Sequence, residues 1–530
     1  MRLSKLKKQL KDNYGIQPSL HYFAGAMQAI RTYFDYRRDN HLDEFLLDDT
    51  TWHDLSGDDI FKRINSGLSS SGEQYLYYLL RSPAIEKSEY DKRAEFIGIM
   101  EHDPDLRLKL QVVLAKLGRR HAANTCEAFQ PSSHSPKKLL LYLLLVLALI
   151  AGAISLIFTT KAMLLFICLL IFIPSYHQFA SIRMERDLAT VTYSVAMVFA
   201  VRKIQKIASP KLDQHLTSFY ESGRRLKAIT RIGHVPTNTT AGEFAALLNS
   251  LLLLDLITYE FHKNRLGKHH ADIFQIHEYL GRIDSAIAIS SYRKSLDVYS
   301  IPQIDFSPSA SVSVYGINLV HPLIENAVPN DLATKKPVLL TGSNASGKST
   351  FLKTVAVNAI LAQGICTAIG NNYFAPAFRI YSSMAIADNL LAGESYYISE
   401  IKSLKRIMDA DASKQPLLCV IDEVLRGTNT VERIAASAEF LKYLTGKKMI
   451  CLAATHDIEL CTLLAGYYRL LHFEETITDE GEILFDYTIK DGPATTRNAL
   501  KLLSSMGFDQ EMVNRANEKA NMYIAVGKWM

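Results

Sequence analysis

The residues with the clearest chemical potential form a short polar loop between two apolar segments. The run TGSNASGKST follows a short apolar stretch that begins at Pro337, and an apolar helix is expected from about Phe351. Two glycines and a Lys-Ser pair at this spacing, between a strand and a helix, are typical of a loop that wraps around phosphate groups. Its backbone N–H groups would hold phosphate oxygens, Lys348 would contact the β- and γ-phosphates, and Ser349 would bind Mg²⁺. The predicted cofactor-binding residues are Gly342, Ser343, Asn344, Ala345, Ser346, Gly347, Lys348, Ser349 and Thr350.

Two acidic residues follow a second apolar run further along the chain. Leu417 to Ile421 has the composition of a buried strand, and Asp422 and Glu423 stand at its carboxyl end. One carboxylate at such a strand end can hold the Mg²⁺ shell beside a phosphate loop, and its neighbour can orient an attacking water. We therefore predict Asp422, with Ser349, as a metal-site residue and Glu423 as a catalytic residue. Two solvated acids at a strand end are the alternative interpretation of these residues alone.

A third apolar run, MICLAATHD, ends at His456 after the polar turn RGTNT at residues 426–430. A strand-end histidine at this place suits contact with a γ-phosphate or with the attacking water. His456 therefore joins the predicted catalytic residues, and the alternative is a purely structural histidine.

These elements, in this order, resemble the MutS family of DNA mismatch repair ATPases, whose nucleotide domains are related to the ABC class. The resemblance rests on the phosphate loop, on IDEVLRGTNT with ATHDIEL, and on YSSMAIADNLLAGESYYISEI at residues 381–401. It implies ATP and Mg²⁺ as cofactors, ATP hydrolysis, and a homodimer formed through the ATPase domains. In the family the 381–401 segment is a signature loop that reaches the partner's γ-phosphate. Ser395 would therefore act in trans as a third catalytic residue, although Glu394 stands where the family commonly has Arg.

The resemblance continues on both sides of the ATPase domain. A segment beginning DDIFKRINSGLSSSGEQ is similar to the family's helical core and lever, and DGPATTRNALKLLSSMGFDQEMVNRANEKA looks like its C-terminal helix-turn-helix. Residues 1–42 alone precede the core-like segment, so we expect no mismatch-recognition domain. The family's adenine-stacking aromatic is replaced here, with Ala327 and Val328 near its place, and Tyr315 or His321 would serve instead.

A long uncharged segment interrupts the helical half of the chain. Leu139 to Phe158 has no charged residue and would span about 30 Å as a helix, which matches one hydrocarbon thickness. A second apolar run, Ala162 to Tyr176, follows the turn residue Lys161. A buried soluble hairpin is the alternative, but these runs would leave it no polar face. Basic residues flank the pair on the outside, which predicts a transmembrane hairpin with both ends in the cytoplasm; they are Lys137, Lys138, Arg183 and Arg186.

Composition sets the broad class of the protein. With 530 residues, 48% apolar and 21% charged, the chain is globular and long enough for several domains. Its 59 basic and 54 acidic residues are too balanced to indicate nucleic-acid binding by themselves. The six cysteines lack the spacing of a zinc site, which indicates reduced thiols in a cytosolic protein.

The predicted fold is multi-domain: an α-helical core and lever domain interrupted by a transmembrane helical hairpin, then a P-loop α/β ATPase domain with a C-terminal helix-turn-helix. The expected divisions are 1–42 (basic helical segment), 43–136 and 177–300 (core and lever), 137–176 (hairpin), 301–492 (ATPase) and 493–530 (dimer brace). The first helix would lie on an anionic membrane surface or be simply solvated.

Three functions remain open from the sequence. The first is a MutS-type ATPase of the inner membrane with cytoplasmic N- and C-terminal domains, which binds DNA and serves mismatch repair or related DNA maintenance. The second is a membrane ATPase whose nucleotide-driven levers act on lipid or on a membrane partner. The third is an ATP-dependent dimerisation scaffold. A basic cluster would contact DNA phosphates or lipid head groups, or form a solvated helix face; its residues are Arg224, Arg225, Lys227 and Arg231.

Overall fold

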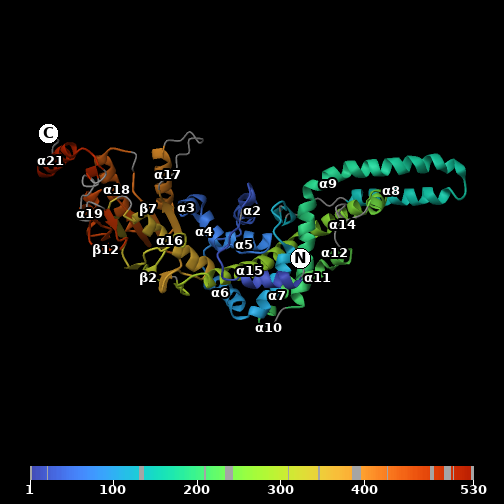
Figure 1. Ribbon diagram of the computed structural model, residues 1–530, viewed down its shortest axis with the longest axis horizontal. Coiled ribbons are helices and arrows are strands. Elements are labelled where there is room, and N and C mark those ends of the chain that lie inside the picture. Colours follow the sequence, from blue (N-terminus) through green and yellow to red (C-terminus); the bar gives the residue numbers. More distant parts are fainter. Residues whose placement is uncertain are drawn as a thin grey trace. The chain divides into compact units, whose positions relative to one another are not determined.

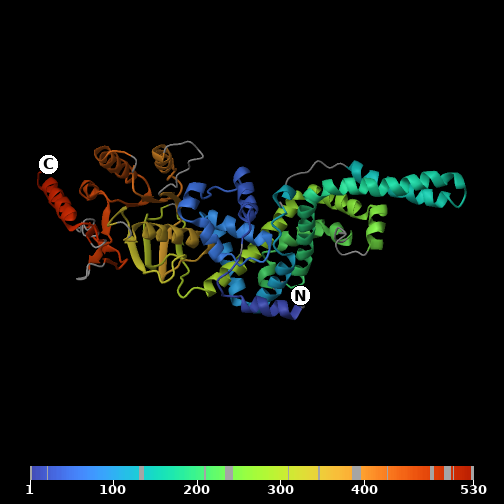
Figure 2. The ribbon, with the colours of Figure 1, turned by 45° about the horizontal axis from the view of Figure 1, so that its top comes forward.

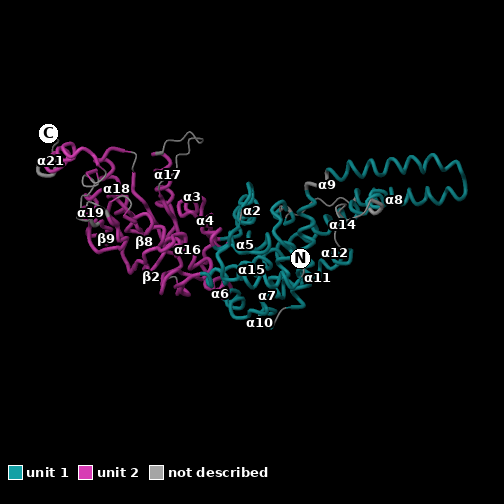
Figure 3. Tube along the Cα trace, in the orientation of Figure 1, with its two compact units in different colours: residues 1–43, 64–78, 95–295 teal, residues 44–63, 79–94, 296–530 magenta. Residues whose placement is uncertain are grey.

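The computed structural model describes residues 3–20, 22–123, 125–129, 136–207, 210–232, 243–307, 309–343, 346–384, 396–425, 428–477, 483–494, 503–504 and 507–526. The chain forms two compact units, coloured separately in Figure 3. Unit 1 comprises residues 1–43, 64–78 and 95–295, and unit 2 comprises residues 44–63, 79–94 and 296–530. The protein is thus multi-domain, with a helical unit and a unit built on mixed sheets.

Unit 1 is helical throughout its described residues (Figure 1). The first helix, α1, packs on α7, so at least one of its faces is covered by protein. Two helices, α5 and α6, continue from one unit into the other. The helices that lie wholly or partly in unit 1 are α1 (Leu3–Asp12), α2 (Ala26–Asp39), α5 (Ser70–Arg81), α6 (Lys87–His102), α7 (Pro104–Leu117), α8 (Pro136–Ser155), α9 (Met163–Gln205), α10 (Pro210–Asp213), α11 (Thr217–Arg225), α12 (Lys227–Ile232), α13 (Glu243–Leu252), α14 (Leu254–Lys268) and α15 (His270–Lys294), with the short 3₁₀ helices η1 (Thr125–Phe129) and η2 (Thr160–Ala162).

Helices α5 and α15 approach each other closely where both carry glycine. A Cβ atom at Gly281 would lie 2.5 Å from the Cβ of Tyr75, and one at Gly72 would lie 2.1 Å from an Asp284 oxygen. The fully buried Asp284 carboxylate accepts hydrogen bonds from the N–H groups just before α5, including that of Ser69 at 2.8 Å. Burial raises the pKa of Asp284 to about 6, against the opposing effect of these donors. This crossing is the tightest part of the core of unit 1 that the structure describes.

A hairpin made of α8 and the first half of α9 extends from the other helices of unit 1 (Figures 1 and 2). Its two helical segments, Lys137–Ser155 and Thr160–Ile182, are long and apolar enough to cross a membrane, and few of their side chains are buried. The second segment is longer than the apolar run expected to end at Tyr176, because α9 continues without a break through Pro174 to Gln205. By length and composition, both helices therefore meet the requirement for a span.

Unit 2 contains a six-stranded sheet in the order β12-β9-β4-β8-β7-β6, with β12 antiparallel to its neighbour and the other strands parallel. A four-stranded sheet, β1-β5-β2-β3, and the pair β10-β11 accompany it. The strands are β1 (Gln303–Asp305), β2 (Val314–Leu319), β3 (Asn330–Thr334), β4 (Val338–Thr341), β5 (Asn372–Pro376), β6 (Arg379–Ser383), β7 (Leu417–Asp422), β8 (Met449–Ala454), β9 (Arg469–His472), β10 (Glu475–Ile477), β11 (Ile483–Phe485) and β12 (Lys490–Asp491). The helices are α3 (Asp49–Asp54), α4 (Gly57–Ile64), α16 (Lys348–Ile365), α17 (Tyr396–Asp409), α18 (Thr430–Leu444), α19 (Ile458–Leu464) and α21 (Gln510–Val526).

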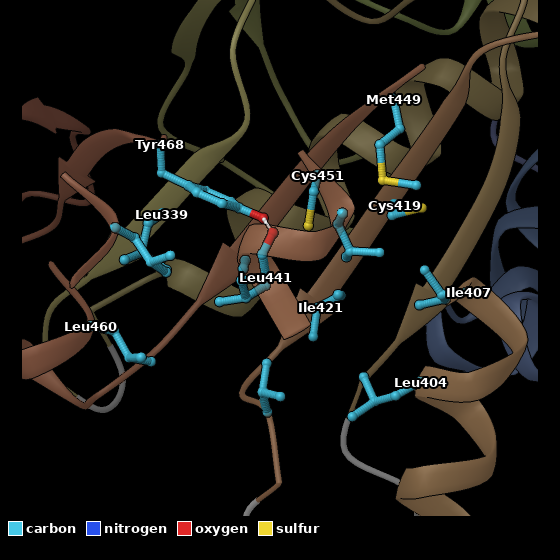
Figure 4. Close-up of a cluster of buried hydrophobic side chains, with 14 of the residues drawn as sticks. Leu339, Leu404, Ile407, Cys419, Ile421, Leu441, Met449, Cys451, Leu460 and Tyr468 are labelled. Carbon is cyan, nitrogen blue, oxygen red and sulfur yellow. Dashed lines mark hydrogen bonds between the residues drawn. The ribbon is translucent and has the colours of Figure 1, made fainter. Parts of the chain in front are cut away.

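The central strands of unit 2 are completely buried because helices cover them. Side chains of β4, β7 and β8 meet those of α17, α18 and α19 in one apolar cluster (Figure 4). Cys419 and Cys451 lie in this cluster as small apolar residues, and the hydroxyl of Tyr468 donates to the carbonyl of Leu441 at 2.9 Å. Apolar runs in parallel strands covered on both faces match the expected α/β organisation of this region.

The observed units differ from the expected divisions before residue 136. Residues 44–63 and 79–94 belong to unit 2, although we expected them in the helical core. Buried polar contacts explain the difference: Arg81 has no exposed side-chain surface and donates to the Leu47 carbonyl at 2.8 Å. Asp54 likewise accepts from the hydroxyl of Ser382 at 2.6 Å. Of the predicted C-terminal helix-turn-helix, the structure describes helix α21, whereas residues 495–502 and 505–506 before it lie outside the described residues.

The glycine crossing predicts a specific loss of stability. Gly281→Ala should lower the thermal unfolding midpoint of the detergent-solubilised protein by several degrees, because overpacking costs about 1–3 kcal/mol. Gly98→Ala is the matched control, since Gly98 is also helical and a Cβ there would have nothing within 4 Å. Equal midpoints for the two variants would contradict the close approach of α5 and α15.

Candidate functional site

The predicted site residues follow three neighbouring strands of the six-stranded sheet. Leu340 of β4 and Asp422 of β7 both pair with Ala454 of β8, so β8 lies between the other two strands. Parallel strands have their carboxyl ends at the same edge of a sheet. This register therefore places the loop after β4, the acidic pair Asp422–Glu423 and the residues after β8 at one edge, where ligands bind in open α/β sheets.

The loop after β4 turns sharply at its two glycines. Gly342 and Gly347 have φ values of 141° and 110°, which only glycine adopts readily. A Cβ atom at Gly342 would also lie 2.6 Å from the carbonyl oxygen of Phe473. Asn344 and Ala345 lie outside the described residues. The tight turn leads directly into α16, whose first-turn N–H groups can receive an anion.

Backbone carbonyl groups of the loop hold its lysine over the turn. The Lys348 ammonium donates to the carbonyl oxygens of Gly342 and Ser343 at 2.7 and 2.6 Å and is almost fully buried. Ser346 also donates to the Ser343 carbonyl, at 2.9 Å. Ser349, by contrast, is exposed at the start of α16, together with Thr350. The ammonium group of Lys348 is thus held in place, and the exposed Ser349 and Thr350, which carry hydroxyl groups, follow it directly in the chain.

Glu423 and His456 meet at the edge of the sheet. The Nε2 atom of His456 lies 2.7 Å from Oε1 of Glu423, and both side chains are partly exposed. Glu423 has a φ of 65°, and its N–H donates to the carbonyl of Ala454. A left-handed conformation in a residue other than glycine is uncommon and concentrates at functional sites. The chain thus turns sharply after Asp422 and brings the carboxylate to the histidine.

An ion pair next to His456 supports its position. Arg433 of α18 donates to both carboxylate oxygens of Asp457, at 2.9 and 2.6 Å. On the other side, the N–H of Thr455 donates to the carbonyl of Leu340. His456 is therefore held between a residue tied to α18 and a residue tied to β4. Sequence reasoning missed Arg433, because only the folded chain brings α18 beside the end of β8.

A pocket of about 340 Å³ opens beside the phosphate-type loop. Gly347 and Thr350 form part of its wall, so it is continuous with the loop, and its largely apolar lining suits a flat organic ring. Burial and the charge of Lys353 lower the pKa of His321 to about 4, so this lining residue is neutral near pH 7. The lining residues are Leu319, His321, Ile324, Glu325, Asn326, Ala327, Val328, Asn330, Gly347, Thr350, Phe351, Thr354, Phe473 and Tyr487.

The pocket distinguishes between the two residues expected to stack on the adenine base. His321 lines it and Tyr315 does not, whereas Tyr487 and Phe473 supply aromatic rings that the sequence did not indicate. Tyr487 stands far from the loop in the chain. It reaches the pocket because β3 lies close to its segment, as shown by the hydrogen bond from the Asn330 amide to the Tyr487 carbonyl at 2.9 Å.

A buried carboxylate also contacts the loop. Glu475 of β10 accepts a hydrogen bond from the hydroxyl of Ser343 at 2.8 Å, and only 8% of its surface is exposed. No motif in the sequence indicated this residue. Its negative charge lies beside the loop carbonyls that hold Lys348 and would oppose the approach of another anion.

Several predicted features cannot be placed. Ser395 and most of the expected signature loop lie outside the described residues, between β6 and α17. Within the described part of the chain, no three His, Cys, Asp or Glu residues are grouped closely enough to hold a metal ion. A Mg²⁺ ion at this edge would therefore need Ser349, Asp422 and oxygen atoms of a phosphate ligand.

Comparison with known proteins agrees with this geometry. A family model described as MutS domain V matches residues 338–523. This region of the chain is thus a MutS-type domain V. The domain V match begins at β4 and includes the loop, the acidic pair and His456.

Three relatives carry the name DNA mismatch repair protein MutS. That of Pseudothermotoga lettingae is 30% identical over 258 residues, which cover 46% of this chain and 31% of the relative. That of Thermus thermophilus is 31% identical over 37% of this chain and 24% of the relative. That of Rickettsia rickettsii is 26% identical over 54% of this chain and 34% of the relative. The chain thus spans about a quarter to a third of the length of these MutS proteins.

The position of Glu475 gives a prediction about nucleotide affinity. Glu475→Gln keeps a hydrogen-bond acceptor for Ser343 but removes a charge next to the loop, so it should tighten ATP binding by about three- to tenfold. Glu474→Gln is the control, because Glu474 pairs with Lys490 instead. Titration of a fluorescent ATP analogue measures both affinities. Unchanged or weaker binding by the Glu475 variant would show that this carboxylate does not oppose the phosphates.

Proposed function

We propose that this MutS-family chain binds and hydrolyses ATP in the presence of Mg²⁺. The observation that carries the proposal is the shared sheet edge, at which the glycine loop with Lys348 stands beside the Glu423–His456 pair. The match to domain V over the same residues supports it. The pocket next to Gly347 has the position and lining for the adenine base.

Each residue has a proposed role in this reaction. Lys348 and the first-turn N–H groups of α16 bind the β- and γ-phosphates, and Ser349 and Asp422 hold the cation, which supplies charge neutralisation when bound. Glu423 orients the attacking water and accepts its proton, while His456 holds the Glu423 carboxylate in place and faces the γ-phosphate. By the family resemblance, Ser395 of a second copy would complete the site, which makes the active species a homodimer.

We also propose that the hairpin of α8 and α9 anchors the protein in the cell inner membrane. Two adjacent helices with exposed apolar surfaces would leave a large apolar area in water, which soluble proteins avoid. The hairpin is held at its base by the rest of unit 1, so both of its ends lie on one side. Because the ATPase domain must meet cytosolic ATP, that side is the cytoplasm.

The names of the relatives favour DNA as the substrate of the whole protein. We propose DNA binding and a role in mismatch repair or related DNA maintenance. The hairpin favours a second candidate, in which the same ATPase acts on lipid or on a membrane partner. Binding of the solubilised protein to duplex, mismatched and branched DNA distinguishes them. Contacts to DNA phosphates must weaken steeply as salt rises, and no binding at low salt would favour the membrane function.

The proposed roles predict separable effects on binding and turnover. Glu423→Ala should keep ATP binding but lower turnover about a hundredfold or more, since a positioned general base contributes roughly 10²–10⁴. Lys348→Ala should lose ATP binding itself. Glu439→Ala, an exposed residue of α18, serves as the control. Phosphate release and nucleotide binding are measured in parallel, and parental turnover by the Glu423 variant would refute its catalytic role.

The proposed topology predicts the accessibility of introduced cysteines. In a chain with Cys126 and Cys168 replaced by Ser, Thr160→Cys in the hairpin turn should react with an impermeant maleimide added to intact spheroplasts. Lys109→Cys, on the exposed surface of α7, should react only after lysis. Protection of both positions in intact cells, with release of the protein by carbonate, would show that the hairpin does not cross the membrane.

A further inference from the structure

The corner between α13 and α14 lies against the base of the hairpin. Helix α13 packs on α9, and α14 packs on both α8 and α9. The two short helices meet at Leu253, whose φ of 50° turns the chain sharply. Figures 1 and 2 show α14 beside the start of the hairpin. This corner therefore lies close to the point where the proposed spans begin.

Buried polar contacts fix the corner to α9. Nε2 of His177 lies 2.8 Å from the Asp255 carboxylate, and these side chains are only 8% and 6% exposed. The backbone N–H of Asp255 donates to the side-chain oxygen of Asn249 at 3.1 Å, which joins α13 to α14. His177 belongs to the second candidate span, close to its inner end. The corner thus has a defined position relative to the hairpin, because breaking this pair would cost the free energy of leaving buried polar atoms without a partner.

Apolar side chains on this fixed corner are exposed. Leu247 and Leu248 of α13 are 53% and 40% exposed, and Leu254 of α14 is 44% exposed. On the adjoining part of α9, Phe179 and Ile182 are 57% and 65% exposed. Exposed apolar side chains therefore occur on the corner as well as at the inner end of the second candidate span.

Basic residues lie on the elements next to the corner. Helix α12 packs on α9 and α14 and exposes Lys227 and Arg231, together with Ile232. Lys137 and Lys138 are exposed at the start of α8. Leucines beside lysines and arginines are the composition of a surface that lies in the boundary between lipid head groups and acyl chains.

We propose that the α13–α14 corner, residues 247–254, is a second membrane contact that sits in the interfacial layer of the bilayer at the base of the hairpin. The leucines enter the boundary of the acyl chains, and Lys227 and Arg231 bind anionic lipid phosphates. The inference rests on the proposed membrane anchoring. It adds that the start of helix α14 is held at the membrane surface, so that the hairpin cannot rotate freely about its own axis relative to the bilayer.

Lipid quenching of single fluorophores tests the proposal on the full chain. Cys126 and Cys168 are replaced by Ser, and one cysteine is introduced for an environment-sensitive label: Leu248→Cys in the corner, Leu147→Cys in α8, or Lys109→Cys on α7. Each protein is reconstituted in phosphatidylcholine–phosphatidylglycerol vesicles with a spin label at a shallow or a deep acyl position. We expect shallow labels to quench Leu248→Cys about twofold or more, deep labels to quench Leu147→Cys, and neither to quench Lys109→Cys.

The outcomes separate this inference from the anchoring on which it rests. If Leu147→Cys is quenched and Leu248→Cys is not, the hairpin is inserted but the corner is not a lipid contact. If neither is quenched, the anchoring itself is wrong, and the corner proposal fails with it. Protection of Leu248→Cys from both lipid quenchers and aqueous iodide would mean that a second copy covers the corner, which also overturns the proposal.

Charge reversal tests the lipid phosphate contact separately. The double variant Lys227→Glu, Arg231→Glu should reduce shallow quenching of Leu248→Cys in vesicles with phosphatidylglycerol, and have little effect in pure phosphatidylcholine. The matched control is Lys109→Glu, Lys116→Glu on α7, where both lysines are also exposed. Equal loss in both lipids, or equal loss with the control pair, would contradict recognition of anionic head groups.

Discussion

The parallel pairing of β4, β8 and β7 determines what unit 2 can do. Its register aligns Leu340, Ala454 and Asp422 across three strands, so the segments that follow them leave the sheet at one edge. The apolar cluster beneath the sheet holds this register, because a slip of one residue would turn buried side chains such as Cys419 to the opposite face. The phosphate-type loop, the acidic pair and His456 depend on that alignment for their proximity.

The backbone conformation of single residues then sets the orientation of the groups at this edge. Positive φ values at Gly342 and Gly347 curl the loop, and the left-handed Glu423 turns its carboxylate to His456. Two further polar contacts lie around these residues: the Arg433–Asp457 ion pair and the hydrogen bond from Ser343 to Glu475. The edge of the sheet is therefore a connected set of charged groups, in which one substitution changes the environment of several others.

Helix α9 links two very different environments in unit 1. Its first half exposes apolar side chains along the hairpin, whereas its second half buries Tyr193, Met197 and Val201 in the helical core. The hydroxyl of Tyr193 accepts a hydrogen bond from the N–H of Ser71 at 3.0 Å, at the start of α5. A single helix of about 65 Å thus runs from the proposed membrane region to the α5–α15 crossing. Its rigidity gives the core of unit 1 a direct mechanical connection to the hairpin.

The sequence by itself determined the local features. The buried strands before the loop, before Asp422 and before His456 are found where the apolar runs predicted them, because such runs have few other stable solutions. The sequence also predicted the loop glycines and the hairpin. A tight turn requires glycine at particular positions, and a membrane span requires an uncharged run of a certain length. The family resemblance was likewise carried by short contiguous motifs, and the domain V match confirms it.

Only the tertiary structure decided which distant residues share a site. Tyr487 joins the pocket, Glu475 reaches the loop, and residues 44–63 and 79–94 pack with unit 2, although nothing in their local sequence indicates these neighbours. The leucines of the α13–α14 corner are exposed where the chain turns sharply at Leu253. Pairing across a sheet and packing around a turn depend on the whole chain, so apolar periodicity and motif spacing could not specify them.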